Sequence, residues 1–288
     1  MFAFFFISSF KDMVNMHWTG IAWPAMFCLA YLYITQLKTK RKFITVLLTV
    51  NLVLIIVLRI NFMCNAFPLS NFNDRNPEVM TKMLQEKAKD YPLVFKDMYN
   101  EPSYYMFYGH QKAYAFNTIW YKKTQFNNLP ELERDFQNKA VGLVTRDSVN
   151  ASSEKVPVPK GKDYYITVIP NFTSYNTTIK VKAEKFADMK ASSESKVKVS
   201  VESLLTDSAR ALFKAKGGYI LLSLTNKKTN EVFYSKYNGQ SDLTNKGVFD
   251  FTFTAPAQKG EYRAVFSALT GDSFLIGFNS NTYNCKVE

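Results

Sequence analysis

Apolar residues are concentrated in the first quarter of the chain, in two long runs that stand close together. Residues 18–37 contain no charged residue, and residues 43–63 contain a single one, Arg59. Each run is about as long as a helix must be to cross a hydrocarbon core of roughly 30 Å. The pattern predicts a membrane region over residues 1–65 with two transmembrane helices.

A short basic segment, Lys38-Thr39-Lys40-Arg41-Lys42, separates the two apolar runs. Lys and Arg in short loops favour the cytoplasmic side of a membrane. We therefore expect a helical hairpin with its tip inside the cell, and the residues after Cys64 outside the cytoplasm. The predicted location is the inner (plasma) membrane, crossed more than once, with soluble domains in the periplasm or outside the cell.

The first ten residues are apolar and aromatic but too few to span a bilayer. They lack the basic start and the small-residue cleavage site of a signal peptide. We expect them to be the end of a truncated helix, and the chain to be the C-terminal portion of a longer multispan protein.

Helical and strand patterns alternate over residues 74–147. Three helix starts carry Pro at an early helical position, and they are Asn76-Pro77, Glu101-Pro102 and Leu129-Pro130. Strand-like segments lie between and after these helices, at 92–95, 112–117 and 140–144. This alternation predicts a small extracytoplasmic α/β domain with a largely parallel sheet.

Residues 156–288 contain short alternating apolar segments separated by turn residues, which predicts an extracytoplasmic β-sandwich domain. The expected strands are 164–169, 178–183, 197–201, 219–224, 232–237, 248–253, 262–269 and 273–278, with one helix at 204–214. The polar stretch 148–155 is the expected linker between two separately folding domains. The predicted fold class is membrane-anchored α+β.

The chain is basic, with a formal net charge of +12 over 288 residues. Such a balance suits nucleic acid, anionic lipid or an acidic substrate. The densest basic cluster lies between the two apolar runs, where it is a topology signal. We therefore expect membrane lipid, and no nucleic acid, among the partners.

The cysteines and histidines limit the possible metal and disulfide chemistry. Cys28 lies inside an apolar run, whereas Cys64 and Cys285 flank the soluble part and leave open whether they form a disulfide. His17 and His110 are the only histidines, which excludes a multi-histidine metal site. No metal site and no cofactor are expected.

The first candidate site lies at the outer mouth of the first predicted span. Lys11 could hold a phosphate as a point charge, and Asn15 and His17 could donate hydrogen bonds. Trp18 could lie at the headgroup level or stack on a sugar. The alternative is an ordinary membrane interface with an aromatic belt and a solvated loop.

A second candidate region is rich in aromatic residues and carries Lys122 and Lys123. Its aromatic members are Tyr104, Tyr105, Phe107, Tyr108, Trp120 and Tyr121. Aromatic platforms beside cations can bind sugars, but aromatic residues at helical spacing are more often core. The sequence contains no nucleophile elbow, phosphate loop, dinucleotide fingerprint, zinc-protease motif or calcium loop.

Two segments carry a family resemblance. The first is Phe6-Ile-Ser-Ser-Phe-Lys-Asp-Met-Val-Asn-Met-His-Trp-Thr-Gly-Ile-Ala-Trp-Pro-Ala25, and the second is Tyr99-Asn-Glu-Pro-Ser-Tyr-Tyr-Met-Phe-Tyr108. Both resemble bacterial glycosyltransferases of the C-type superfamily, as found in Bacteroidetes. That group is similar to the protein mannosyltransferases and the aminoarabinose transferase of lipid A. The resemblance covers about residues 1–147.

The resemblance implies a membrane enzyme that transfers a sugar from a polyprenyl-phosphate carrier to a glycan, lipid or protein acceptor. Its catalytic carboxylate lies in the first outer loop, and no position here matches it; Asp12 lies in a later loop. We therefore expect this chain alone to be inactive. The alternatives are a membrane-anchored module that binds glycan or protein without catalysis, or a structural anchor.

Overall fold

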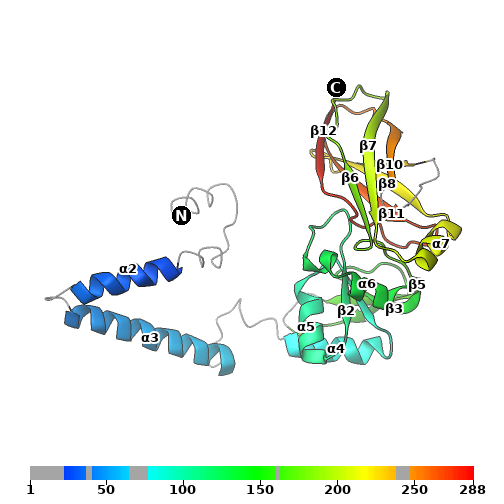
Figure 1. Ribbon diagram of the computed structural model, residues 1–288. Coiled ribbons are helices and arrows are strands. Elements are labelled where there is room, and N and C mark those ends of the chain that lie inside the picture. Colours follow the sequence, from blue (N-terminus) through cyan, green and yellow to red (C-terminus); the bar gives the residue numbers. More distant parts are fainter. Residues whose placement is uncertain (1–22, 37–40, 65–76, 160–162, 238–246) are drawn as a thin grey trace. The chain divides into compact units, whose positions relative to one another are not determined.

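The structure is a computed structural model that describes residues 23–36, 41–64, 77–159, 163–237 and 247–288. The chain divides into two units, residues 1–73 and residues 74–288. The smaller unit holds the helices α2 and α3, and the larger holds every strand that the structure describes (Figure 1).

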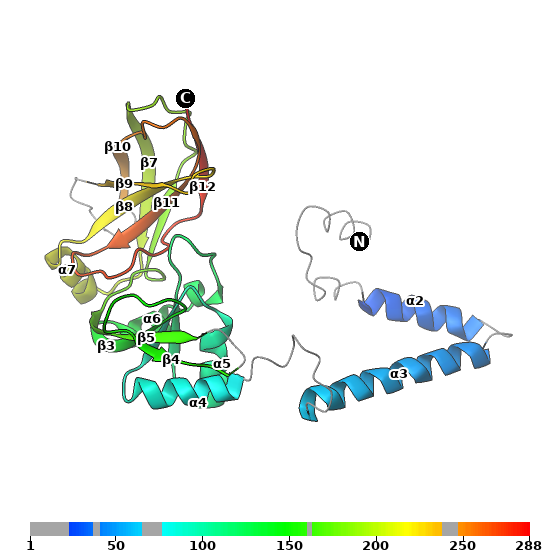
Figure 2. The same ribbon diagram turned by 180° about the vertical axis from the view of Figure 1, so that it is seen from behind.

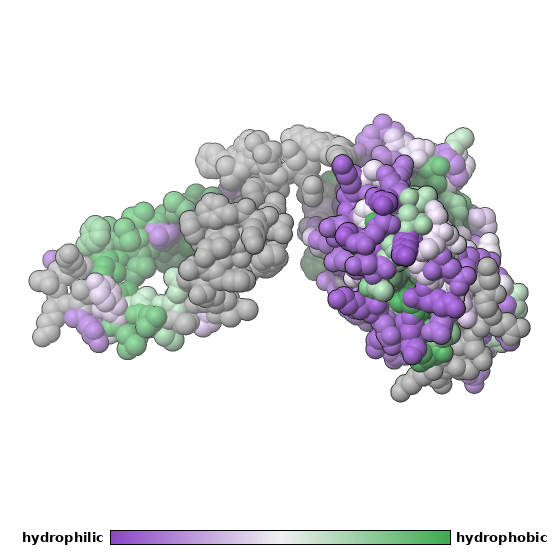
Figure 3. All heavy atoms as spheres, turned by 90° about the horizontal axis from the view of Figure 1, so that it is seen from above, coloured by the Kyte–Doolittle hydropathy of each residue, from purple (hydrophilic) through white to green (hydrophobic). Residues whose placement is uncertain are grey.

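One helix of the smaller unit is long and apolar enough to cross a membrane. This helix, α3 (Arg41–Cys64), contains a stretch of mean hydropathy 2.6, Lys42–Asn61, whose apolar side chains are not buried. Apolar residues dominate the described part of this unit, whereas hydrophilic residues dominate the visible face of the larger unit (Figure 3). The expected span 43–63 therefore falls within a suitable helix.

The second expected span is described only in part. Helix α2 (Trp23–Gln36) has 14 residues, and residues 18–22 and residue 37 of the expected span 18–37 lie outside the described residues. In the part of the chain that the structure describes, α3 alone has the length and hydropathy of a span. A second span therefore stays a prediction, as does the truncated helix end expected within residues 1–10.

Residues 77–172 form the first lobe of the larger unit, which we call the α/β lobe. Its sheet has the strand order β2-β1-β3-β5-β4. The elements are α4 (Pro77–Ala88), β1 (Leu93–Lys96), α5 (Asn100–Gly109), β2 (Ala113–Phe116), η2 (Gln125–Asn128), α6 (Pro130–Phe136), β3 (Lys139–Thr145), β4 (Glu154–Val156) and β5 (Tyr164–Phe172). Strands β1, β2 and β3 are parallel, whereas β5 runs antiparallel to β3 and β4. The expected largely parallel sheet is thus a mixed sheet.

The α/β lobe has three layers because alternate residues of its strands point to opposite faces. Phe95 contributes to the cluster that α4 and α5 cover, and Val94 contributes to the cluster that contains Phe136 of α6. Figures 1 and 2 both place α4 at the end of the unit away from the second lobe, and α6 on the side of that lobe.

Residues 179–288 form the second lobe, which we call the sandwich lobe. Its two antiparallel sheets have the orders β10-β7-β6 and β12-β11-β8-β9. The elements are β6 (Ile179–Ala183), β7 (Glu194–Ser203), α7 (Asp207–Ala215), β8 (Tyr219–Asn226), β9 (Val232–Lys236), β10 (Gly247–Thr254), β11 (Gly260–Leu269) and β12 (Tyr283–Val287). Val199 and Phe251 of one sheet share a core with Leu222 and Phe266 of the other. The expected β-sandwich is confirmed.

A buried tyrosine fixes the connection between β10 and β11. The Tyr262 hydroxyl donates a hydrogen bond of 2.7 Å to the carbonyl oxygen of Gln258, four residues upstream. This is the tyrosine corner of immunoglobulin-like sandwiches, in which a tyrosine near a strand start bonds back to the preceding turn. The sandwich lobe therefore combines two packed antiparallel sheets with a hydrogen bond typical of immunoglobulin-like sandwiches.

One boundary prediction and one strand prediction were wrong. Residues 148–155 are not the linker between the lobes, because β4 begins within them and pairs with β5 in the first sheet. The chain passes between the lobes at residues 173–178, all buried, which we call the joining segment. Residues 273–278 form no regular strand, and the last strand is β12 instead. Separate folding of the two lobes stays a prediction.

Candidate functional site

The first candidate site cannot be located. Lys11, Asn15, His17 and Trp18 all lie outside the described residues. Their proposed contacts with a lipid phosphate stay predictions.

The aromatic region contains one residue that belongs to the core. Tyr105 of α5 is 1% exposed and packs against Phe95, with ring centroids 5.8 Å apart. Its hydroxyl donates a hydrogen bond of 2.5 Å to Oε1 of Gln111, and burial raises its pKa to about 12. The core interpretation is therefore correct for Tyr105.

The neighbouring aromatic residues of α5 face outward. Tyr104 is 39% exposed, Phe107 71% and Tyr108 41%. They follow the i, i+3, i+4 spacing of one helix face, and the rings of Phe107 and Tyr108 meet edge to face at 4.9 Å. Asn100 and Ser103 complete this face, which we call the α5 face, and it carries no charged residue.

Cations surround the start of α5 but are already engaged. The Nζ atom of Lys122 lies 5.0 Å from the ring centroid of Tyr99. Arg146 forms an ion pair of 2.5 Å with Glu101 and covers the ring of Tyr164 at 4.0 Å. These contacts join α5 to the strand ends, so they explain the local structure without a ligand.

A second group of polar atoms lies at the carboxyl end of β1. Asp97 has a left-handed backbone with φ of 55°, and its carboxylate accepts hydrogen bonds from the Thr118 N–H at 2.7 Å and the Thr118 hydroxyl at 2.8 Å. Burial raises the pKa of Asp97, and the two hydrogen bonds oppose that shift. Asp97 thus ties β1 to the segment after β2.

The contact between the lobes is centred on a buried carboxylate. Glu133 of α6 is 0% exposed and accepts hydrogen bonds from the Tyr114 hydroxyl at 3.0 Å and from the Ser174 hydroxyl. It also accepts bonds from the Thr177 N–H at 3.0 Å, the Thr177 hydroxyl at 2.5 Å and the Thr178 N–H at 3.1 Å. Glu133 therefore holds the joining segment against the α/β lobe.

Two asparagines extend this contact into the sandwich lobe. Asn176 donates to the carbonyl of Asn117 at 3.0 Å and accepts from the Phe278 N–H at 3.1 Å. Asn279 donates to the Ile179 carbonyl at 2.8 Å and accepts from the Ala268 N–H at 2.8 Å. Side-chain amides thus add to the isolated backbone bridge between Thr118 and Gly277 at this boundary.

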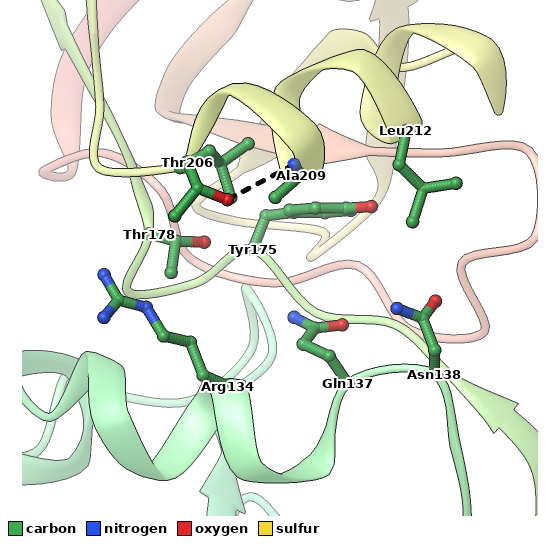
Figure 4. A pocket seen from close by; sticks show the side chains of 9 residues that line it. Arg134, Gln137, Asn138, Tyr175, Thr178, Thr206, Ala209 and Leu212 are labelled. Atoms are coloured by element: carbon green, nitrogen blue, oxygen red, sulfur yellow. Dashed lines mark hydrogen bonds between the residues drawn. The ribbon is translucent and has the colours of Figure 1, made fainter.

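A crevice of about 170 Å³ opens between α6 and α7, as Figure 4 shows. Its lining consists of Arg134, Gln137, Asn138, Tyr175, Thr178, Leu205, Thr206, Ala209 and Leu212. The Gln137 amide is bonded to the backbone of Ser174, and Oδ1 of Asn138 accepts from Lys216 at 3.0 Å. Thr206 caps α7 by accepting from the Ala209 N–H at 3.3 Å.

The side-chain amides of Gln137 and Asn138 therefore help to join the lobes. Oγ1 of Thr178, a buried atom in the lining of the crevice, has no hydrogen-bond partner in the described part of the chain. The volume is below the roughly 300 Å³ at which small-molecule pockets usually begin. The crevice is better explained as the edge of the contact between the lobes than as a preformed ligand site.

The residues that the structure describes form no metal-binding cluster and no reactive thiol site. No three His, Cys, Asp or Glu side chains there are close enough to hold a metal ion. Cys285 is a free thiol in the sandwich core, and burial raises its pKa to about 11. The side chain of Cys64 lies outside the described part of the chain, so its pairing with Cys285 stays open.

Neither protein-family profiles nor curated proteins give a match to the chain. Two solved structures of the CARDB domain of PF1109 from Pyrococcus furiosus are similar to 38% of the chain at 13% identity. The solution NMR structure is covered to 92% with a TM-score of 0.23, and the crystal structure, a complex with di-metal ions, to 86% with a TM-score of 0.19. These values do not place the chain in that family.

Proposed function

We propose that the chain is the membrane-anchored outer part of a glycosyltransferase that takes its sugar from polyprenyl phosphate. The observation that carries the anchor is α3, whose apolar stretch has a mean hydropathy of 2.6 and unburied apolar side chains. An uncovered apolar helix of this length is stable in a bilayer and costly in water. In this proposal α2 belongs to a second span, Lys38–Lys42 lie in the cytoplasm, and residues 74–288 lie outside it.

The glycosyltransferase assignment is supported by the sequence resemblance of residues 6–25 and 99–108. An acceptor oxygen attacks the anomeric carbon, and the bond from that carbon to the phosphate oxygen breaks. Polyprenyl phosphate leaves with the electron pair, while the acceptor proton passes to a carboxylate outside this chain. Lys11 neutralises the leaving phosphate, and Asn15, His17 and Trp18 position the donor at the membrane surface.

The test compares two lysine variants of the full-length enzyme with its lipid-linked donor. Lys11→Ala should lower the transfer rate about a hundredfold or more, because losing a charge contact to a developing phosphate costs roughly 2–4 kcal/mol. Lys196→Ala is the matched control, since Lys196 is 64% exposed in the sandwich lobe. Equal rates for the two variants would show that Lys11 makes no contact with the leaving phosphate and is an ordinary solvated lysine.

A non-enzymatic binding module is the second candidate. The outward aromatic residues of α5 favour it, because three such side chains on one uncharged face suit contact with a partner. Absence of any transfer by the full-length protein, with anchoring intact, would decide for this candidate.

A further inference from the structure

The α5 face differs from an ordinary solvated helix face. A surface helix usually turns charged residues outward. Helix α4 follows that rule, since Glu78 and Lys82 form an exposed ion pair of 2.7 Å. The α5 face, beside it, presents Phe107 at 71% exposure with two tyrosines and no charge.

The composition of the α5 face matches a particular environment. Tyrosine combines an apolar ring with a polar hydroxyl, and it is enriched where lipid headgroups meet the hydrocarbon core. Phe107 supplies the apolar centre, while Tyr104, Tyr108 and the amide of Asn100 can keep contact with water. Lys122 contacts the ring of Tyr99 but its side chain stays exposed, so it adds a cation that an anionic headgroup would attract.

The chain also keeps this face near a bilayer. Twelve residues separate the end of α3 at Cys64 from the start of α4 at Pro77. Such a connection reaches at most about 45 Å, even when fully extended. A tether of this length gives an effective concentration on the order of millimolar, so a weak interfacial affinity is sufficient for docking.

We propose that the α5 face docks onto the phospholipid bilayer in which α3 is anchored. This inference rests on the proposed anchor but not on sugar transfer. A glycan is the weaker choice of occupant, because the face is the convex side of a helix and the crevice lined by Tyr175 lies elsewhere. Docking would hold the α/β lobe on the membrane, with the α5 face toward the lipid.

The experiment uses the full chain in vesicles of phosphatidylcholine and phosphatidylglycerol, with Cys28 and Cys64 replaced by Ser. An environment-sensitive fluorophore is attached at Ser103→Cys, which lies on the α5 face and leaves every aromatic residue in place. Leu54→Cys on α3 reports anchoring, and Leu212→Cys on α7, 42% exposed, is the solvated control. Buried Cys285 stays unlabelled.

Docking predicts that doxyl-labelled lipids quench the probes at positions 54 and 103 but not at 212. Adding Phe107→Glu should abolish the quenching at 103 and leave that at 54 unchanged. Quenching of the 103 probe by aqueous iodide would overturn docking but leave the anchor intact. Shielding of this probe from both iodide and doxyl lipids would also overturn docking, because it would indicate that a protein covers the α5 face. An unquenched probe at 54 would overturn the anchor and the docking together.

Discussion

Two helices of the α/β lobe invert the usual arrangement of polar and apolar residues in opposite ways. Helix α6 buries the carboxylate of Glu133, whereas α5 exposes the ring of Phe107. The buried charge is satisfied by five hydrogen-bond donors, so its position is explained within the structure. The exposed ring has no such internal explanation. The position of Glu133 is thus explained by hydrogen bonds within the fold, whereas the exposure of Phe107 is explained by no contact within it.

The sharpest test of the stabilising role of the buried carboxylate is Glu133→Ala. The variant leaves the N–H groups of Thr177 and Thr178 buried without their acceptor, and it removes hydrogen bonds to a charged group. We expect a loss of roughly 3–5 kcal/mol in the free energy of unfolding. The melting temperature of the detergent-solubilised chain, followed by circular dichroism, should fall by roughly 10 °C or more.

Glu131→Ala is the matched control, because Glu131 belongs to the same helix and is exposed. Its melting temperature should stay close to that of the unchanged chain. A Glu133→Ala shift no larger than this control would show that the joining segment is held by apolar packing instead.

The sequence predicted the elements whose signal is local. The helix at 204–214 corresponds to α7, and seven of the eight expected strands of the last domain correspond to β5 through β11. Each depends on periodicity and turn residues within about ten positions. The elements that were missed, β4 and β12, are short and depend on the strand beside them.

The lobe boundary and Glu133 could not be predicted because they depend on distant contacts. The joining segment Thr173-Ser-Tyr-Asn-Thr-Thr178 has the composition of a surface loop, yet every residue is buried. Its donors are satisfied by a helix some 40 positions earlier in the chain. The α5 face could be predicted from the sequence, because helical spacing places Tyr104, Phe107 and Tyr108 on one side of the helix and Tyr105 on another.

A smaller effect is expected at Asp97, a second carboxylate with fewer donors than Glu133. Burial raises the pKa of Asp97 above its unfolded value, so ionisation of this group costs stability. Its stabilising contribution is present below the unfolded pKa and is lost as pH rises through the folded pKa. Asp97→Asn, which tolerates the left-handed backbone, removes that dependence.

The measurement is the difference in melting temperature between Asp97→Asn and the unchanged chain over a series of pH values. The variant should gain relative to the unchanged chain as the pH rises above the usual range of an aspartate. A difference that stays constant, or that falls with rising pH, would mean that Thr118 stabilises the ionised form enough to offset burial.

The smallest effect on stability is expected where the exposed side of the comparison is changed. Phe107→Glu removes an edge-to-face contact with Tyr108 but buries no new group, because the side chain is mostly in solvent. Glutamate is also a better helix former than phenylalanine. The free energy of unfolding should therefore change by less than about 1 kcal/mol. Tyr105→Glu, two positions away, would place a carboxylate in the core and should unfold the lobe. If Phe107→Glu lowered the melting temperature of the solubilised chain as much as Tyr105→Glu, the ring would be part of the core, and the α5 face would no longer be free for a bilayer.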